Sequence, residues 1–284
     1  MFRVPLFTLD ESFGADERLL NDPLVKKGRS RLSQLAASLN AHLLVGVDRG
    51  NILPERSPVD KSAYQVEHYN SCVFCTAEGQ ITGFYDKMHL LPFGEYIPFA
   101  DWLPLLASAT PITGSAVPGV GPTAMTADGV VYAPNICYET VLPHVIRKHL
   151  VELAEQGNRP DVLVNLTNDA WYWGSSELDM HLASGVMRAI ETDTPLVVAA
   201  NRGLSTHIDA SGRIVEVSQR DIAEYLLADV AIDPRRRDGA PRLTPYARFG
   251  DWLPIACLIA STLAAVKGSA LFSDLRKADG KIDA

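Results

Sequence analysis

The sequence is poor in features that define some simple classes of protein. It has only four cysteines (Cys72, Cys75, Cys137 and Cys257) in 284 residues, too few for a disulfide framework. Its 26 Lys and Arg are outnumbered by 34 Asp and Glu, and this net charge of −8 argues against a nucleic-acid partner. The opening residues, MFRVPLFTLDES, are not typical of a secretory signal peptide.

Long uncharged apolar runs are also scarce, and one segment stands apart. Residues 252–266, WLPIACLIASTLAAV, carry no charge between Asp251 and Lys267. As a helix this segment would be about 22 Å long, shorter than the ~30 Å hydrocarbon core of a bilayer. The residues alone therefore leave two interpretations open, a buried core helix or a thin membrane span.

The rest of the chain alternates helical and strand-like patterns, as expected for a layered α/β fold. We predict loops over 51–65 and 91–123, where polar, proline and glycine residues gather. The predicted helices cover 24–40, 140–156 and 179–193. The predicted strands cover 42–50, 66–77, 80–86, 129–137, 161–169, 196–201 and 225–232, with a hairpin over 206–217.

Cys137 is the first candidate for chemistry, because it stands where a predicted apolar strand ends and a predicted helix begins. A thiol there lies near unpaired backbone N–H groups and the positive end of a helix dipole. Both favour the thiolate, which is the form that attacks a carbonyl carbon. The alternative is a structural cysteine that acts as a small apolar side chain at a strand end.

A second segment places Lys87, His89 and Glu95 among aromatic and turn-forming residues. Charges in such an apolar context are costly unless they are paired. A Lys87–Glu95 pair beside a thiol would let the lysine stabilise a developing oxyanion, and His89 is the nearest candidate base. The alternative is an exposed loop whose lysine keeps its ammonium group in water.

A third segment follows the predicted buried strand at 161–169. Ligand sites in open α/β sheets gather at the C-terminal ends of strands. Asn168 and Asp169 are therefore candidates for holding a substrate, and Trp171 and Trp173 for lining an apolar pocket. The alternative is a turn capped by core aromatics.

Two other spacings favour a structural role. Arg188 and Glu191 lie three residues apart on a predicted helix, which favours a plain surface ion pair. Cys72 and Cys75 have CxxC spacing, but they have no second pair and no histidine partner, so zinc is not indicated.

Taken in this order, the three segments resemble the carbon–nitrogen hydrolase (nitrilase) superfamily, and within it the membrane branch of apolipoprotein N-acyltransferases. The likeness covers residues 40–267. Its motifs are Tyr85-Asp86-Lys87-x-His89-Leu90-x-Pro92-Phe93-Gly94-Glu95-x-x-Pro98, Ile136-Cys137-Tyr138-Glu139, Asn168-Asp169-Ala170-Trp171 and Leu243-Thr244-Pro245-Tyr246-Ala247-Arg248-x-Gly250-Asp251-Trp252.

The resemblance implies an α/β fold, a four-layer α-β-β-α sandwich that forms a catalytic domain over residues 1–248. A transmembrane helix over 249–272 and a polar tail over 273–284 are expected to follow. The resemblance also implies Cys137 as the nucleophile, Lys87 as the oxyanion stabiliser and Glu95 as an accessory carboxylate. The supporting residues around the floor and entrance of the site are then Tyr138, Glu139, Asn168, Asp169 and Trp171.

The implied reaction is acyl transfer in two steps. Cys137 takes an acyl chain from a phospholipid as a thioester, then passes it to the free α-amine of a lipoprotein's diacylglyceryl-modified N-terminal cysteine. The implied setting is the bacterial inner membrane, with the catalytic domain on the periplasmic face. Basic residues in the tail (Lys267, Arg276, Lys277 and Lys281) are compatible with that orientation. We expect no cofactor and no metal.

Two features of the family are not found in the sequence. The family's general-base glutamate ends an early apolar strand, whereas Glu11 and Glu17 follow no such strand, so neither is assigned. The first strand–helix–strand of the fold and the N-terminal membrane helices are not found either. We therefore expect an N-terminally truncated chain whose base lies upstream of Met1. Two alternatives stay open, an amidase of the same superfamily and an inactive remnant that binds lipid or a partner.

Overall fold

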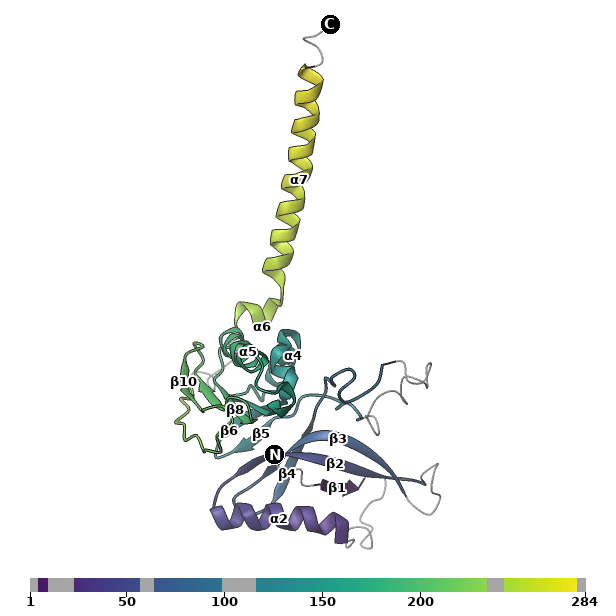
Figure 1. The fold of residues 1–284 in the computed structure, drawn as a ribbon, viewed down its shortest axis with the longest axis vertical. Coiled ribbons are helices and arrows are strands. Elements are labelled where there is room, and N and C mark those ends of the chain that lie inside the picture. The colour runs from purple at the N-terminus through teal and green to yellow at the C-terminus, as the bar shows by residue number, and fades with distance from the viewer. Residues whose placement is uncertain (1–4, 10–22, 57–63, 99–115, 234–242, 280–284) are drawn as a thin grey trace.

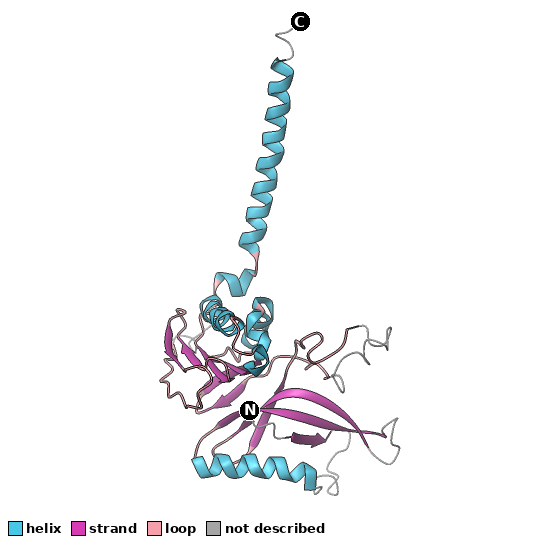
Figure 2. Cartoon of the chain, viewed as in Figure 1, coloured by secondary structure: helices cyan, strands magenta, loops and turns pink. Residues whose placement is uncertain are grey.

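Two β-sheets lie face to face, with helices on their outer faces (Figures 1 and 2). The computed structural model describes residues 5–9, 23–56, 64–98, 116–233 and 243–279. The first sheet has the strand order β1-β2-β3-β4, and the second has the order β10-β9-β8-β7-β6-β5.

The first sheet is built from the N-terminal part of the chain. Its elements are β1 (Pro5–Leu9), helix α2 (Pro23–Leu39), β2 (Leu43–Arg56), β3 (Tyr64–Cys75) and β4 (Ile81–Asp86). β1 runs parallel to β2, while β2, β3 and β4 form an antiparallel meander. These elements include a strand–helix–strand unit, β1-α2-β2, of which sequence analysis predicted α2 and the first part of β2 but not β1.

The second sheet combines a parallel centre with antiparallel edges. Its strands are β5 (Met125–Ala127), β6 (Val130–Ile136), β7 (Val162–Asn168), β8 (Leu196–Asn201), β9 (Thr206–Ile208) and β10 (Ile214–Val217). Helix α4 (Pro143–Glu155) links β6 to β7, and helix α5 (Glu177–Thr192) links β7 to β8. The two strands of each linked pair are parallel, because the crossover helix carries the chain back to the end of the sheet at which the first strand of the pair began.

Three apolar clusters show that the layers follow the order helix, sheet, sheet, helix. Leu32 of α2 packs against Leu6, Val47 and Val73 of the first sheet. The two sheets meet through residues from both: Cys72, Phe74, Tyr85, Met125, Ala127, Ile136 and Leu166. Beyond the second sheet, α4 and α5 pack on it through Ala133, Ile146, Leu153, Leu163, Ala189, Leu196 and Ile208. The four-layer α-β-β-α arrangement is therefore present in the described residues.

Three sequence predictions about single elements were wrong. β2 continues to Arg56 through part of the predicted loop at 51–65, because β3 pairs with it along this length. Residues 225–232 form no strand; Tyr225 and Leu227 are exposed there, and no described strand pairs with them. The helix predicted at 140–156 is divided into a 3₁₀ turn, η2 (Cys137–Val141), and α4. Part of the predicted loop at 91–123, residues 99–115, lies outside the described residues.

The C-terminal segment forms a long helix that projects from the two-sheet body (Figure 1). A short helix, α6 (Pro245–Phe249), is followed by Gly250, whose φ of +62° is a conformation that glycine adopts most readily. α7 (Trp252–Asp279) then begins, so the segment predicted at 249–272 is helical from Trp252 onward. None of the helices in the described ranges is long and apolar enough to cross a bilayer, so the predicted transmembrane helix is not supported.

Candidate active site

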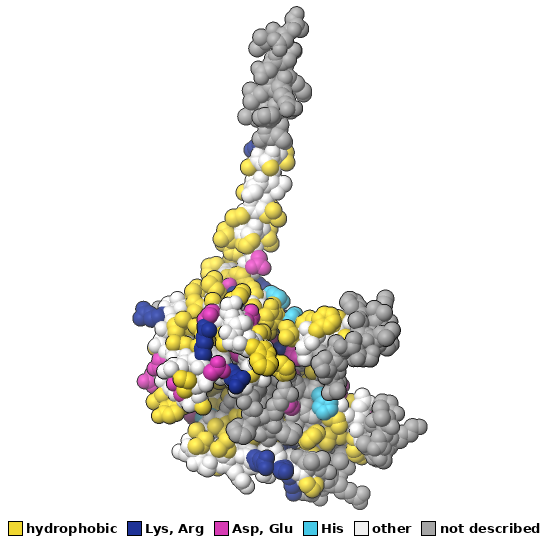
Figure 3. Space-filling model, viewed as in Figure 1, with side chains coloured by type: hydrophobic (Ala, Val, Ile, Leu, Met, Phe, Trp, Pro, Cys, Tyr) yellow, Lys and Arg dark blue, Asp and Glu magenta, His cyan; other side chains and the backbone are white. Residues whose placement is uncertain are grey.

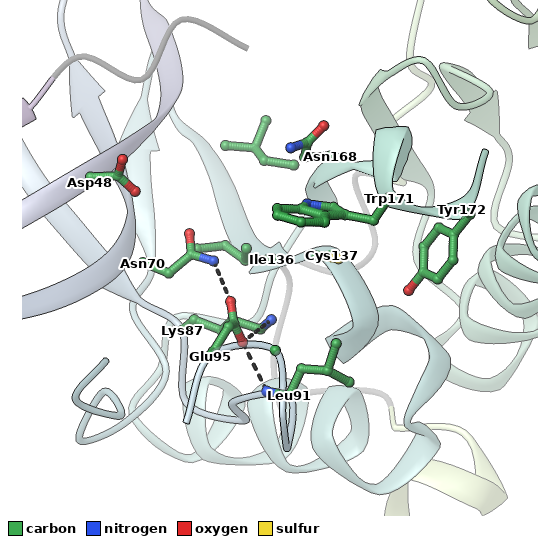
Figure 4. A pocket seen from close by; sticks show the side chains of 12 residues that line it. Asp48, Asn70, Lys87, Leu91, Glu95, Ile136, Cys137, Asn168, Trp171 and Tyr172 are labelled. Atoms are coloured by element: carbon green, nitrogen blue, oxygen red, sulfur yellow. Dashed lines mark hydrogen bonds and ion pairs between the residues drawn. The ribbon is translucent and has the colours of Figure 1, made fainter. Parts of the chain in front are cut away.

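A cavity of about 220 Å³ lies between the ends of the two sheets (Figure 4). Its lining includes Cys137 and Lys87, which are 50 residues apart in the sequence. The predicted residues Glu95, Asn168 and Trp171 line it as well. The remaining lining residues are Asp48, Asn70, Leu91, Gly94, Ile136, Leu166 and Tyr172.

Cys137 stands at a sharp turn between a strand and a short helix. β6 ends at Ile136, and the next residue begins the 3₁₀ turn η2. Cys137 has φ = +52°, a left-handed conformation that a non-glycine residue keeps only where its surroundings hold it. The expected position at the first turn of a long helix is corrected here, because α4 begins only at Pro143. Backbone strain, not a long helix dipole, distinguishes this thiol.

A buried polar ladder holds the turn at Cys137. Asn165 on β7 donates from Nδ2 to the carbonyl oxygen of Cys137 at 3.1 Å and to Oδ1 of Asn135 at 2.7 Å. Thr140 donates to the same Asn135 oxygen from the other side of the turn. Asn135, Thr140 and Asn165 are at most 1% exposed. Bonds of this kind keep the left-handed backbone in place because buried polar groups need their partners.

Lys87 is a buried lysine with a carboxylate partner, which removes the alternative of an exposed loop. Its side chain is 2% exposed, and its Nζ lies 2.6 Å from Oε2 of Glu95. Asn70 Nδ2 and the Leu91 N–H also donate to Glu95, at 2.7 and 2.8 Å. Burial acts to raise the pKa of Glu95, but the Lys87 ammonium and these hydrogen bonds outweigh it and lower that pKa. The pair therefore places a positive charge in the wall of the cavity.

Glu139 lies beneath the cavity, not in its lining, and it joins the lysine segment to the cysteine turn. Its Oε1 accepts from the N–H groups of Met88 and His89, both at 2.9 Å. Its Oε2 accepts from the Ile136 N–H at 2.8 Å and from the Tyr85 hydroxyl at 2.9 Å. Burial raises its pKa, while these hydrogen bonds act against the rise. The carboxylate fixes the residues beside Lys87 and Cys137 in one arrangement.

The third predicted segment is divided between the cavity and the core. Asn168 lines the cavity, and its Oδ1 accepts a hydrogen bond from Asn201 Nδ2 at 2.7 Å. Trp171 also lines it while remaining 69% exposed, so it stands at the entrance. Asp169 is buried behind them, where it accepts from Thr167 and lies 3.3 Å from His181 Nδ1.

Other predicted residues lie away from the lining. Tyr138 is half-buried within the turn η2. Trp173 is 90% exposed, so it does not wall the pocket as expected. The candidate base His89 instead packs edge-on against His144, with ring centroids 6.1 Å apart, and burial lowers its pKa. Glu11 and Glu17 lie outside the described residues.

Sequence reasoning missed Asp48, Asn70 and Tyr172, all of which line the cavity. Burial and the neighbouring Cys137 side chain raise the pKa of Tyr172 to about 12, so its hydroxyl remains a donor at neutral pH. Asp48 lies within β2 and Asn70 within β3, and neither belongs to a sequence motif. The only signals that could have indicated them are their polar residue type and the register of the two strands.

Arg188 was also misjudged. It is 5% exposed, and its two-point bond to Glu191 lies beside its bonds to the carbonyl oxygens of Thr140 and Val141. It is therefore a buried clamp on the end of η2, not part of a surface ion pair.

Residues 27–237 match the family model named carbon-nitrogen hydrolase. The chain belongs to this family. The match includes the lysine segment, the cysteine turn and the segment after β7, so every wall of the cavity lies within it.

Curated relatives of the chain carry the name apolipoprotein N-acyltransferase. The one from Bradyrhizobium diazoefficiens is 36% identical over 231 residues, covering 79% of this chain and 39% of the relative. Those from Rhodopirellula baltica and Geobacter metallireducens are 33% and 31% identical, covering 70% and 83% of this chain. The chain thus spans about two fifths of the length of the first of these relatives and similar shares of the others.

Solved structures of the superfamily are more distant. A mutant of the amidase from Nesterenkonia sp. AN1 in complex with butyramide is 18% identical, with a TM-score of 0.45 over 69% of this chain and 64% of that one. A carbon-nitrogen hydrolase from Helicobacter pylori G27 is 15% identical, with the same TM-score over 68% and 63% of the two chains.

Proposed function

We propose that this chain transfers a fatty acyl chain from a phospholipid, through a thioester on Cys137, to the N-terminal amine of a diacylglyceryl-modified lipoprotein. The observation that carries the proposal is that Cys137 and the Lys87–Glu95 pair line one cavity. The similarity to curated apolipoprotein N-acyltransferases supports the choice of donor and acceptor.

The first half-reaction needs a nucleophile that reaches the carbonyl carbon and a positive charge that lies beside the carbonyl oxygen. The sulfur of Cys137 forms a bond to the ester carbon of the phospholipid, and negative charge develops on the carbonyl oxygen. Lys87 stabilises that charge, while Glu95 and Asn70 keep the ammonium group in position. The ester C–O bond then breaks, and the lysophospholipid oxygen leaves with the proton of the thiol. A thioester remains on the enzyme.

The second half-reaction passes the acyl chain to an amine. The amine nitrogen attacks the thioester carbon, the same lysine stabilises the new oxyanion, and the C–S bond breaks. A thioester is a reactive acyl donor toward an amine, so no further activation of the acyl group is required. Cys137 is restored and the product is an amide.

A membrane setting follows from the substrates proposed. The described part of α7 presents exposed apolar side chains: Leu253, Ile255, Leu258, Ile259, Leu263 and Val266 (Figure 3). Contact with lipid would remove this apolar surface from water. We place the catalytic body at the periplasmic face of the inner membrane, where lipoprotein acceptors with free amines are presented.

The test is to incubate the purified protein with phospholipid vesicles and to measure its intact mass. We expect an acyl adduct on the wild-type chain that Cys137→Ala abolishes and neutral hydroxylamine removes. Cys257→Ala is the matched control, because that thiol is exposed on α7 and plays no part in the proposal. A diacylglyceryl peptide with a free amine should then receive the acyl chain.

Two results would replace the proposal with one of its alternatives. Release of free fatty acid in place of transfer to the peptide would indicate an amidase-type hydrolase that uses water as the acceptor. Failure of Cys137 to form any adduct, in a chain that still binds the vesicles, would indicate a lipid-binding protein without chemistry.

A further inference from the structure

Asn168 lines the cavity with an amide of which one end is already engaged. Its Oδ1 accepts a hydrogen bond of 2.7 Å from Nδ2 of Asn201, while its Nδ2 donates to no other described residue. Figure 4 shows the Asn168 oxygen pointing away from the other labelled side chains. An amide nitrogen donates and an amide oxygen accepts, so the atom left to face the cavity is a donor.

The pairing of β7 with β8 brings the two asparagines together. Asn168 and Asn201 are the last residues of their strands and are register partners in this parallel pair. Leu166, two residues before Asn168, packs in the core between the sheets, and residues an even number apart share a face. Register partners also share a face, so both asparagines project toward the first sheet at the strand ends where the cavity lies.

The segment after β8 holds the backbone of Asn201 in place. The Ala200 N–H donates to Oγ of Ser205 at 3.1 Å, which closes the turn that follows the strand. A Cβ atom on Gly203 would collide with the carboxylate of Asp169, so this turn packs directly against the segment that follows β7. Since Asn201 has a short side chain on a fixed backbone, its amide stays beside the end of β7.

The proposed acyl donor requires hydrogen-bond donors from the cavity. The oxygens of a carboxylic ester and of a thioester accept hydrogen bonds and donate none. Lys87 meets part of this need with its ammonium group. An Asn168 amide turned the other way would present its oxygen to the substrate, and two acceptors would then oppose each other. The orientation of one amide therefore decides whether this wall attracts the ester or repels it.

We propose that Asn201 is a positioning residue that fixes the orientation of the Asn168 amide, so that Asn168 donates from Nδ2 to an oxygen of the acyl donor. This inference rests on the proposed function. Asn168 touches the substrate in this scheme, and Asn201 acts only through it. The pair thus adds a neutral donor to the charged one that Lys87 supplies.

Asn201→Asp tests the assignment, because it keeps the shape of the side chain and removes its donor. A carboxylate only accepts, so the Asn168 amide should turn its nitrogen toward residue 201 and its oxygen toward the cavity. Asn201→Ala removes the partner altogether and leaves the amide free to turn either way. We expect the single-turnover rate of adduct formation from vesicles to fall roughly tenfold in Asn201→Ala and roughly 10²-fold in Asn201→Asp. A merely structural role predicts the reverse order, because Ala loses both the hydrogen bond and the packing.

A double-substitution cycle shows whether Asn201 acts through Asn168. With Asn168→Ala already present, Asn201→Asp should cause no further loss of rate, because the amide that it reorients is gone. An equal loss in both backgrounds would overturn the proposal, since the new charge would then act on the substrate directly. A wild-type rate in Asn201→Asp, or a greater loss in Asn201→Ala, would overturn it as well. If Asn201→Asp does not fold, Asn201→Leu replaces it in the same cycle, and its loss of rate should likewise vanish without the Asn168 amide.

Two controls separate this inference from the proposed function. Asn158→Asp makes the same chemical change at an exposed residue before β7, at the strand end away from the cavity, and should leave the rate unchanged. Every variant is also assayed with the p-nitrophenyl ester of a medium-chain fatty acid, which acylates a thiol without vesicles. A wild-type chain that reacts with this ester but not with vesicles would refute the proposed function, while the comparison of the Asn201 variants would still decide the inference. A wild-type chain that reacts with neither ester would refute both.

Discussion

Glu139→Gln tests whether the buried carboxylate beneath the cavity organises the site. The glutamate accepts four hydrogen bonds, from the N–H groups of Met88, His89 and Ile136 and from the Tyr85 hydroxyl. Glutamine has nearly the same shape, but its amide nitrogen donates and cannot accept. If its oxygen keeps the Met88 and His89 bonds, the amide nitrogen faces the Ile136 N–H, and two donors then oppose each other.

The magnitude follows from that single mismatch. A buried donor left without an acceptor costs about 1–3 kcal/mol. Tyr85 limits the loss because its hydroxyl can turn to His149, whose Nε2 lies 3.1 Å away. The neutral amide also avoids the burial penalty that raises the pKa of Glu139. We therefore expect the free energy of unfolding to fall by about 1–3 kcal/mol.

The effect on activity should exceed the effect on folding. Glu139 holds the residues next to Lys87 and Cys137, and a displacement of about 1 Å in a site can cost roughly 10² in rate. The assays are urea unfolding and single-turnover adduct formation at a temperature where the variant is folded. Glu152→Gln is the control, since its ion pair with Lys148 is exposed and 3.7 Å long. An unchanged midpoint together with an unchanged rate would refute the reasoning.

Three further predictions test the rest of the site. Lys87→Met should slow adduct formation by roughly 10²–10³, because the oxyanion loses its charged partner; a wild-type rate in the mass assay would remove Lys87 from that role. Asn165→Ala should lower the free energy of unfolding by about 1–3 kcal/mol, because the Cys137 carbonyl loses a buried donor; an unchanged urea midpoint would contradict this. Burial lowers the pKa of His149 from 6.5 to about 4, so the unfolded chain takes up this proton first as pH falls. The neutral His149 therefore contributes about 3 kcal/mol to the free energy of unfolding above pH 6.5, and this contribution is lost as the pH falls toward 4. His149→Gln should flatten the dependence of the free energy of unfolding on pH. Wild-type and variant curves that run parallel between pH 7 and pH 4 would count against this prediction.

Much of the layered architecture could be predicted from local pattern. The apolar run at 161–169 predicts a strand covered on both faces, and β7 is such a strand between the inter-sheet core and the helices. The 3.6-residue period at 24–40 predicts α2, which starts and ends within one residue of that range. These elements follow the sequence because each buries one face, which fixes the period of its apolar residues.

Other elements depended on partners that a local pattern does not reveal. β1 exists because β2 offers it a parallel edge, and residues 225–232 have strand-like composition but no described strand beside them. Arg188 and Glu191 have the same spacing whether their helix face is exposed or buried. The sequence could not distinguish these cases, because burial is decided by what packs against an element.

By itself, the sequence determined that a cysteine follows an apolar strand, that a Lys–Glu segment precedes it and that an Asn-Asp segment comes after it. Only the tertiary structure decided that Lys87, Glu95, Cys137 and Asn168 line one cavity, because β4, β6 and β7 bring segments from two different sheets to the same place. It also decided that Asp48 joins them, since the pairing of β2 with β3 fixes which side chains face the second sheet. Local pattern specifies the elements, and packing between them specifies the site.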